Sequence, residues 1–139
     1  MDKLQYDFID IEIPDFNPEF FDLWLSKVVA VYEKEIGELG FIFCSDDYLL
    51  EMNREHLDHD YYTDVITFDY SDRNQISGDV FVSVDRVLEN AKNFGDGDFH
   101  NELCRVMVHG VLHLIGFKDK TEEESEIMRR EETKNLSKR

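Results

Sequence analysis

Apolar residues recur along the chain with two different periods, and the period separates the expected strands from the expected helices. In YDFIDIEI (6–13), isoleucines alternate with acids, which is the pattern of a half-buried strand. The runs GFIFC (40–44), DVITFDY (64–70) and DVFVSV (79–84) are rich in branched and aromatic residues and also predict strands. The polar insert at 71–78 favours pairing of the last two strands as an antiparallel hairpin.

Apolar spacings of three and four residues predict five helices. They are expected from Pro18 to Gly37, over 47–57, from Asp85 to Gly95, over 96–116 and over 122–136. Asn17 before Pro18 is a cap residue followed by a proline at the first helical position, and Ser45 can cap the second helix. Thr121 and Glu124 form a capping box for the last helix.

These elements follow one another in the order β, α, β, α, β, β, α, α, α. We therefore predict an α+β (mixed α/β) fold, in which one mixed sheet of about four strands packs with about five helices. A length of 139 residues suits one folded unit, so we expect a single domain over residues 1–139.

The composition disfavours several classes of protein. Fifteen Lys and Arg against 32 Asp and Glu give a formal net charge of −17, which repels nucleic acid at long range unless basic groups or a metal ion cluster locally. No apolar run approaches the ~18 residues that span a bilayer, and acids interrupt the N-terminal region, so we expect neither membrane segment nor signal peptide. The protein is therefore expected to be cytoplasmic. Cys44 and Cys104 lie in apolar segments without CxxC spacing, which indicates reduced core residues.

The segment HGVLHLIGFKDK (109–120) carries the clearest chemistry. His109 and His113 are four residues apart, so on a helix both rings project from one face about 6 Å apart. Gly116 falls where the helix is expected to stop, and a left-handed turn there would bring Asp119 back toward the rings. Three protein ligands with a free fourth position are typical of a catalytic zinc site. The alternative is a pair of partly buried histidines bonded to carbonyl groups, beside an ordinary acid.

Gly110 adds two observations to this segment. It lies inside the expected helix at a cost of about 1 kcal/mol relative to alanine, so we expect a close approach by a backbone or a ligand to compensate. It also occupies the position where an HExxH metalloprotease carries its catalytic glutamate. Because that built-in general base is missing, a peptidase is disfavoured.

The stretch ELCRVMVHGVLHLIGF (102–117) resembles the signature of the YbeY family of metal-dependent endoribonucleases and ribosomal RNA maturation factors, which has HGxLHLxG followed by Tyr-Asp-His. Upstream, the blocks MNREHL, TDVITF and GDVFVSV resemble further family segments in the same order and at compatible spacing. The resemblance covers nearly the whole chain from the second strand onward. It implies a mixed sheet of four strands with helices, one zinc ion (Zn2+) as cofactor and RNA as substrate.

The resemblance also assigns residues. It puts the first two zinc-binding histidines of the family at His109 and His113, and the third at Asp119, with Lys118 in place of the usual preceding aspartate. A carboxylate oxygen is an acceptable zinc ligand, so we expect the metal site to be retained. A second departure is Leu57, at a position where the family commonly has an arginine, and the change would remove a phosphate contact.

Five further residues are candidates for the substrate side of the site. Lys118 and Lys120 flank the proposed third ligand and would lie beside a bound phosphate, although such lysines are more often merely solvated. Thr63, Asp64 and Asp79 lie in the TDV and GDV segments and could shape the cleft or orient water. Acids are also common at strand ends and in turns, which is the alternative for both aspartates.

Together with the resemblance, these residues predict a zinc-dependent, single-strand-specific endoribonuclease of ribosomal RNA maturation, at the small-subunit 3′ end, and of ribosome biogenesis. Zinc would polarise the phosphodiester and lower the pKa of water, so His109, His113 and Asp119 would be catalytic through the metal. The expected partners are RNA, above all ribosomal RNA, and the small ribosomal subunit. Two alternatives stay open. One is a metal-stabilised ribosome-associated adaptor with little catalysis, favoured by the charge of −17 and by Leu57, and the other is a metal-dependent hydrolase of another substrate.

Overall fold

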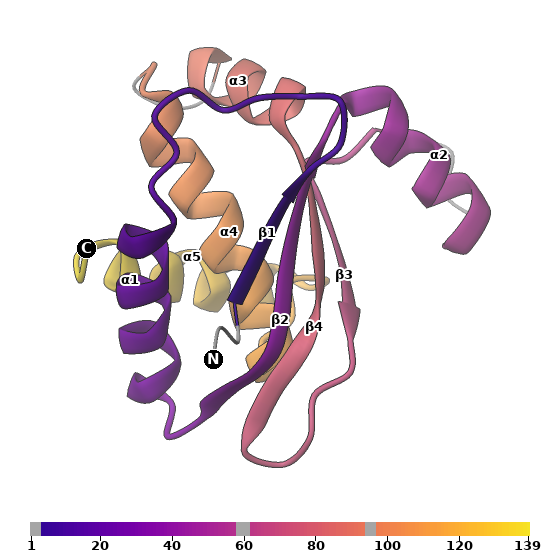
Figure 1. Cartoon of the computed structure of the whole chain (residues 1–139). Coiled ribbons are helices and arrows are strands. Elements are labelled where there is room, and N and C mark those ends of the chain that lie inside the picture. The colour runs from indigo at the N-terminus through magenta and orange to yellow at the C-terminus, as the bar shows by residue number, and fades with distance from the viewer. Residues whose placement is uncertain (1–3, 58–61, 94–96) are drawn as a thin grey trace.

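Four strands form one mixed sheet in the computed structural model, which describes residues 4–57, 62–93 and 97–139 (Figure 1). Across the sheet the order is β1 (Leu4–Phe8), β2 (Glu35–Cys44), β4 (Gln75–Ser83) and β3 (Val65–Asp69). Strands β1, β2 and β4 run parallel, and β3 pairs antiparallel with β4. The predicted hairpin is thus confirmed, but its second strand begins earlier, inside the polar insert.

Five helices accompany the sheet within the described residues, in the predicted order along the chain. They are α1 (Pro18–Val31), α2 (Asp46–His56), α3 (Val84–Asn93), α4 (Phe99–Ile115) and α5 (Glu122–Leu136). The local start signals are confirmed, because the side chains of Asn17 and Ser45 accept from backbone N–H groups of the first turns. Thr121 and Glu124 form the capping box of α5. One mixed sheet with helices is the predicted α+β fold.

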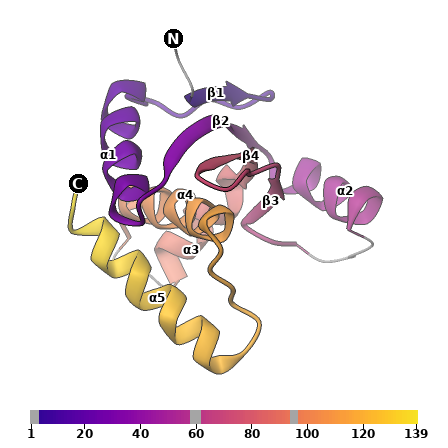
Figure 2. The ribbon, with the colours of Figure 1, turned by 90° about the horizontal axis from the view of Figure 1, so that it is seen from below.

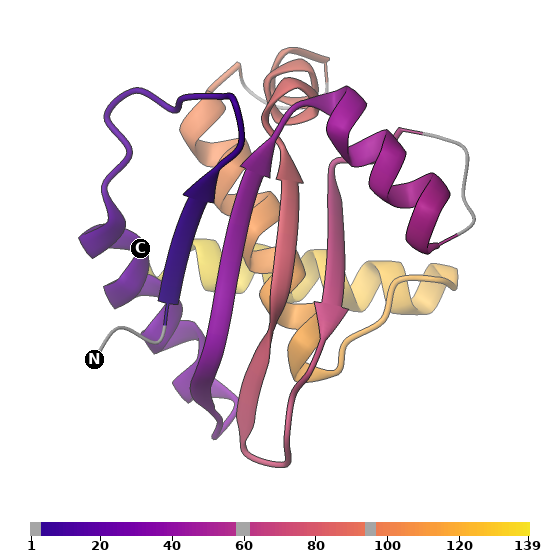
Figure 3. The same cartoon turned by 45° about the vertical axis from the view of Figure 1, so that its right-hand side comes forward.

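Helices α1, α4 and α5 lie on one side of the sheet, as the view from below shows (Figure 2), and α4 packs directly on the strands (Figure 3). The core between helices and sheet is aliphatic and aromatic, and α4 contributes Met107, Val111 and Leu114 among its buried side chains. On the opposite face, Leu49 of α2 packs against Cys44 and Ile66. Side chains along the accessible edge of α4 are therefore carried by a rigid, buried helix.

Gly110 lets α4 approach the β3–β4 hairpin closely. A Cβ atom at this position would lie 2.8 Å from Val80 Cγ1 and 3.4 Å from Thr67 Cγ2, so a larger residue would press the helix away from the strands. The expected close approach is confirmed, although the neighbours are strand side chains rather than a backbone or a ligand. The adjacent His109 is thereby held at a defined height over the hairpin.

The strand expected at 6–13 is wrong in its bounds. Strand β1 ends at Phe8, and Asp10 has a positive φ of 52°, so the backbone leaves the sheet before the alternation ends. Ile9 then packs on the α2 side of the sheet, whereas Ile11 packs against the main core. The alternating isoleucines thus pack against two different hydrophobic clusters. The alternating pattern predicts a single buried face and therefore does not reveal this division.

The predicted end of the first helix, at Gly37, is also wrong. Helix α1 stops at Val31, and Gly37 lies inside β2, where a Cβ atom would collide with Ser77 Oγ. Strand β2 begins before Gly37 because Glu35 and Ile36 pair with Gln75 and Ile76 of β4, whereas β1 pairs only from Leu39 onward. These hydrogen-bonded partners override the helical spacing of nearby apolar residues. The predicted helix end at Gly95 lies outside the described residues.

Two predictions from composition concern membranes and cysteines. Within the residues that the structure describes, no helix is both long and apolar enough to cross a membrane. Cys44 and Cys104 are buried and free, and burial raises the pKa of their thiols to about 12 and about 11. Both cysteines are therefore free core residues, as predicted, and their raised pKa disfavours the reactive thiolate.

Candidate metal centre

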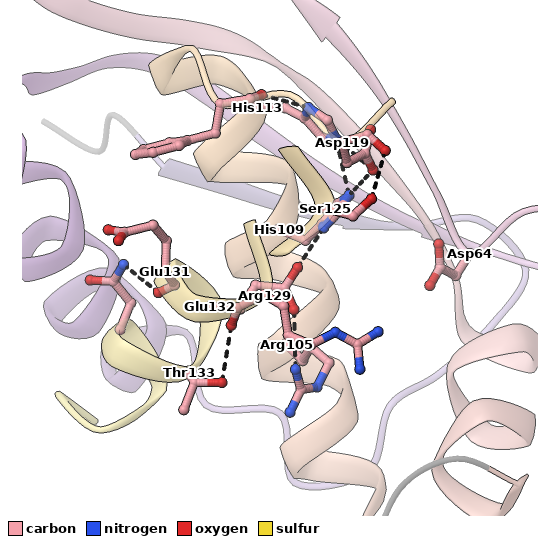
Figure 4. Close-up of polar contacts among 12 residues, drawn as sticks. Asp64, Arg105, His109, His113, Asp119, Ser125, Arg129, Glu131, Glu132 and Thr133 are labelled. Atoms are coloured by element: carbon pink, nitrogen blue, oxygen red, sulfur yellow. Dashed lines mark hydrogen bonds and ion pairs between the residues drawn. The ribbon is translucent and has the colours of Figure 1, made fainter. Parts of the chain in front are cut away.

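Three potential ligand atoms converge beside the C-terminal half of α4 (Figure 4). His109 Nε2 and His113 Nε2 lie 3.0 Å apart, and Asp119 Oδ2 lies 3.3 Å from the first and 3.5 Å from the second. The two rings come from successive turns on one face of the helix, as their spacing requires. Asp119 comes from the loop between α4 and α5. We call these three residues the triad.

The loop returns to the helix because of Gly116. This residue has φ 130°, in the left-handed region that favours glycine, and the N–H groups of Gly116 and Phe117 both donate to Leu112 O. On the other side of the loop, Ser125 Oγ donates to Asp119 O at 3.0 Å. The predicted turn is confirmed, and α4 and α5 hold the two ends of the segment that carries Asp119.

Each histidine of the triad uses its second ring nitrogen to bond the protein. His109 Nδ1 donates to the carboxylate of Glu132, 2.7 Å away, and His113 Nδ1 donates to Phe117 O, 3.0 Å away. A carboxylate and a carbonyl only accept, so each ring carries a proton on Nδ1 and can present a lone pair on Nε2. This orientation is typical of metal-binding histidines.

The separations within the triad fit one metal ion. Ligand atoms about 2.0–2.2 Å from a tetrahedral zinc lie about 3.3–3.6 Å from one another. The observed separations are 3.0, 3.3 and 3.5 Å. Without a cation or a proton between them, two nitrogen lone pairs and a carboxylate oxygen would repel one another at these distances. Two imidazole nitrogens and one carboxylate oxygen accept zinc and other divalent transition metals.

The charges around the triad also favour a cation. Burial lowers the pKa of His109, but the hydrogen bond and charge of Glu132, together with Asp119 and Asp64, outweigh it and leave this pKa above its ordinary value. The pKa of His113 is lowered, first by burial and then by the charge of His109. A proton on His109 Nε2 competes with a metal ion for the same lone pair, so metal binding displaces that proton wherever it is present.

The triad lies where two clefts meet. The larger cleft, of about 800 Å³, follows α4 and α5, and the smaller one, of about 290 Å³, opens toward β3 and α2. His109 and Asp119 line both clefts, and Asp64 also does so. This geometry suits a polymeric ligand, because a chain can reach the triad through one cleft and leave through the other.

Asp64 directly precedes β3 and stands across the larger cleft from α4 and α5 (Figure 4). Its carboxylate accepts a hydrogen bond from Asn90 Nδ2 at 3.3 Å. Burial raises the pKa of Asp64, against an opposing effect of His109. Its neighbour Thr63 lines the smaller cleft. The structure thus brings two of the five predicted substrate-side residues to the clefts.

Asp79 does not lie near the triad. It follows Gly78 in β4 and alternates with Val80, which faces Gly110 of α4. Because successive side chains of a strand point to opposite faces, Asp79 lies on the other face of the sheet, beside Gly40.

The two lysines of the loop and Leu57 have different positions. Lys118 and Lys120 flank Asp119, but both are exposed and line neither cleft. Leu57, which replaces the arginine common in the resembling family, does line the smaller cleft, and 38% of it is exposed. A cation at position 57 would therefore lie near the triad, and this chain has none there.

Sequence reasoning missed Glu132. Only 7% of this residue is exposed, and besides His109 its carboxylate accepts from Arg105 Nη1 at 3.1 Å. A signal exists: Glu132 keeps helical spacing with Met128 and Asn135, the other buried residues of an otherwise exposed, charged helix. A glutamate on the buried stripe of such a helix indicates a polar partner inside the protein.

Comparison of this chain with known proteins identifies the family to which it belongs. The family described as Endoribonuclease YbeY matches residues 10–139. A protein named Endoribonuclease YbeY from Phocaeicola vulgatus is 46% identical over 134 residues, which cover 96% of each chain. Another of that name from Cytophaga hutchinsonii is 52% identical over 115 residues, covering 82% of this chain and 80% of the relative. A solution structure of a protein from Thermotoga maritima has a TM-score of 0.70 and 27% identity, over 97% of this chain and 87% of that one. This chain belongs to the YbeY family of endoribonucleases, as its motifs predicted.

Proposed function

We propose that this chain is an endoribonuclease that uses one zinc ion, held by His109, His113 and Asp119, to cut single-stranded RNA. The observation that carries the proposal is the convergence of two Nε2 atoms and one Oδ2 atom within 3.5 Å of one another at the junction of two clefts. The names of the relatives support RNA as the substrate and endonucleolytic cleavage as the reaction.

The side chains around the triad have distinct tasks in this reaction. A zinc ion held there would supply Lewis acidity to the phosphodiester and lower the pKa of water. Glu132 keeps the Nε2 lone pair of His109 directed toward the ion. Asp64 holds or accepts a proton at its carboxylate across the cleft, and its raised pKa brings it closer to the value that suits a general base at neutral pH. Thr63 shapes the cleft beside it.

The target in this proposal is ribosomal RNA, at the 3′ end of the small-subunit RNA, and the partner is the small ribosomal subunit. The process is ribosome biogenesis in the cytoplasm, and the whole segment 1–139 acts as one catalytic domain. The support is the resemblance of four motif blocks to the family. Lys118 and Lys120, exposed on either side of Asp119, contact phosphates of the incoming strand.

An adaptor of the ribosome with little catalysis is the second candidate, and two observations favour it. The net charge of −17 opposes an RNA strand at long range. Leu57 contributes no phosphate contact to the smaller cleft. A metal-dependent hydrolase of another substrate is the third candidate, because the same three ligands would serve it.

Metal analysis combined with RNA cleavage distinguishes these candidates. Bound metal is quantified by mass spectrometry, and labelled single-stranded RNA, a duplex of the same sequence and ribosomal RNA are offered as substrates. We expect about one zinc per chain and cleavage of the single strand and of ribosomal RNA. Asp119→Ala should lose metal and cleavage, whereas Asp7→Ala, which removes an exposed acid of β1, should lose neither. Metal-loaded protein that binds ribosomes without cutting RNA would favour the adaptor, and full cleavage by Asp119→Ala would refute the three-ligand site.

A further inference from the structure

The larger cleft is a groove between facing stripes of two helices. On α4 it is lined by Asn101, Glu102, Arg105, Val106 and His109, and on α5 by Arg129, Glu132, Thr133 and Leu136. From Glu102 to His109 on α4 and from Arg129 to Leu136 on α5, the lining residues have the i, i+3, i+4, i+7 spacing of a single helix face. Glu132 of α5 bonds His109, and Arg139, which follows α5, bonds Asn101, so the chain along α5 runs from the middle of α4 toward the start of α4.

Three arginines line this groove, although the chain carries a net charge of −17. Arg105 donates to Glu132 at 3.1 Å, and Arg139 donates to Asn101 Oδ1 at 2.7 Å. Arg129 differs from both, because its exposed guanidinium makes no ion pair or hydrogen bond within the ranges 4–57, 62–93 and 97–139. It is therefore the arginine of the groove that is available to an anionic ligand.

Arg129 also lies at the end of the groove closest to the triad. It precedes Glu132, the partner of His109, by one helical turn in the direction of the Asp119 loop. Figure 4 shows Arg129 and Arg105 on one side of the cleft and Asp64 on the other. From Arg129 onward the lined face of α5 extends for about 10 Å at 1.5 Å per residue. This length exceeds the ~3.4 Å rise of one stacked nucleotide.

We infer that the groove between α4 and α5 binds the sugar-phosphate backbone of single-stranded RNA, and that Arg129 contacts the phosphate next to the one that is cut. This inference rests on the proposed function. The described residues that line the groove include no Phe, Tyr or Trp, so the bases find no aromatic surface on which to stack. Recognition along the groove therefore depends on backbone charge and little on base sequence.

Arg129 and Arg130 are a matched pair for the test. Both are exposed arginines of α5, but Arg130 does not line the groove. Binding of a fluorescent single-stranded RNA is measured by anisotropy in the presence of a chelator, so that no strand is cut, from about 50 to about 200 mM salt. We expect Arg129→Gln to weaken binding about tenfold, as the loss of one charge-assisted contact implies, and to reduce the salt slope by ~0.7. Arg130→Gln should change binding by less than about twofold.

Thermal melts equal to wild type establish that both variants are folded. Equal RNA affinity of Arg129→Gln and Arg130→Gln, while the zinc-loaded wild type still cuts RNA, would overturn the groove assignment and leave the proposed function standing. A wild type that neither binds nor cuts RNA would refute the proposed function, and the inference with it. Homopolymers of A, U and C should bind wild type within about threefold of one another, and a preference above about tenfold would contradict backbone recognition.

Discussion

Replacement of Glu132 tests how strongly the second ring nitrogen of His109 controls metal binding. The Glu132 side chain is 9% exposed, and its oxygens lie 2.7 Å from His109 Nδ1 and 3.1 Å from Arg105 Nη1. Glutamine keeps the shape of the side chain but offers one acceptor oxygen and one donor group in place of two acceptors. If the oxygen stays on His109, the amide N–H groups face Arg105, whose side chain is 40% exposed and can turn to water.

Glu132→Gln and Glu132→Ala should therefore lower zinc affinity by different amounts. Partners of the second nitrogen of a ligating histidine contribute about 10- to 100-fold to metal affinity. Glu132→Gln retains one neutral hydrogen bond, so we expect about a tenfold loss of zinc affinity, or ~1.4 kcal/mol. Glu132→Ala removes both bonds, so we expect a loss near 100-fold, or ~2.7 kcal/mol.

The pH dependence of this loss has a definite sign. Because Glu132 raises the pKa of His109 against the effect of burial, its removal lowers that pKa and weakens the competition of protons with the metal. The difference in zinc affinity between wild type and variant should thus be largest above the pKa of His109 and shrink as the pH falls through that pKa.

Competition with a chromogenic chelator measures zinc affinity, and NMR of the metal-free protein follows the titration of His109. Glu126→Gln changes an exposed acid of the same helix and should bind zinc within about twofold of wild type. If folded Glu132→Ala binds zinc as tightly as wild type, Glu132 has no part in positioning His109 and the reasoning is refuted.

Three other substitutions test packing, burial and capping by denaturant unfolding of the metal-free protein. Gly110→Ala puts a Cβ atom 2.8 Å from Val80 Cγ1, so overpacking of about 1–3 kcal/mol should exceed or cancel the ~1 kcal/mol gain in helix propensity. Combination with Val80→Ala should relieve part of this cost, and strictly additive free energies would contradict the contact. Asp64→Asn should stabilise the protein at neutral pH. Burial raises the pKa of Asp64, so the free energy of unfolding of the wild type falls as the pH rises through that folded pKa and the carboxylate ionises inside the protein, whereas asparagine stays neutral. The gain should vanish below the unfolded pKa of about 3.9, and a pH-independent gain would speak against burial as its cause. Thr121→Ala should lower the free energy of unfolding by about 1 kcal/mol through loss of the capping box, whereas no change would mean that water replaces the cap.

Features that depend on neighbours along the chain could be predicted from the sequence by itself. Asn17, Ser45 and Thr121 begin helices because their side-chain oxygens accept from backbone N–H groups three residues on. The four-residue spacing of the histidines puts both rings on one helix face, and Gly116 can adopt the turn that returns Asp119 to them. These local rules predict that the three residues can meet, whereas their assignment as zinc ligands came from the resemblance to the family.

Features that depend on distant residues were decided only by the tertiary structure. Strand β2 reaches back through Gly37 because β4 pairs with Glu35 and Ile36. Glu132 becomes buried because α5 folds back along α4 and meets His109, 23 residues earlier in the chain. Asp79 faces away from the triad because the pairing register of β4 determines which side chains point toward α4. The spacing of apolar residues within a segment indicates the conformation of that segment. Burial and hydrogen-bond partners depend instead on which surfaces meet when the whole chain folds.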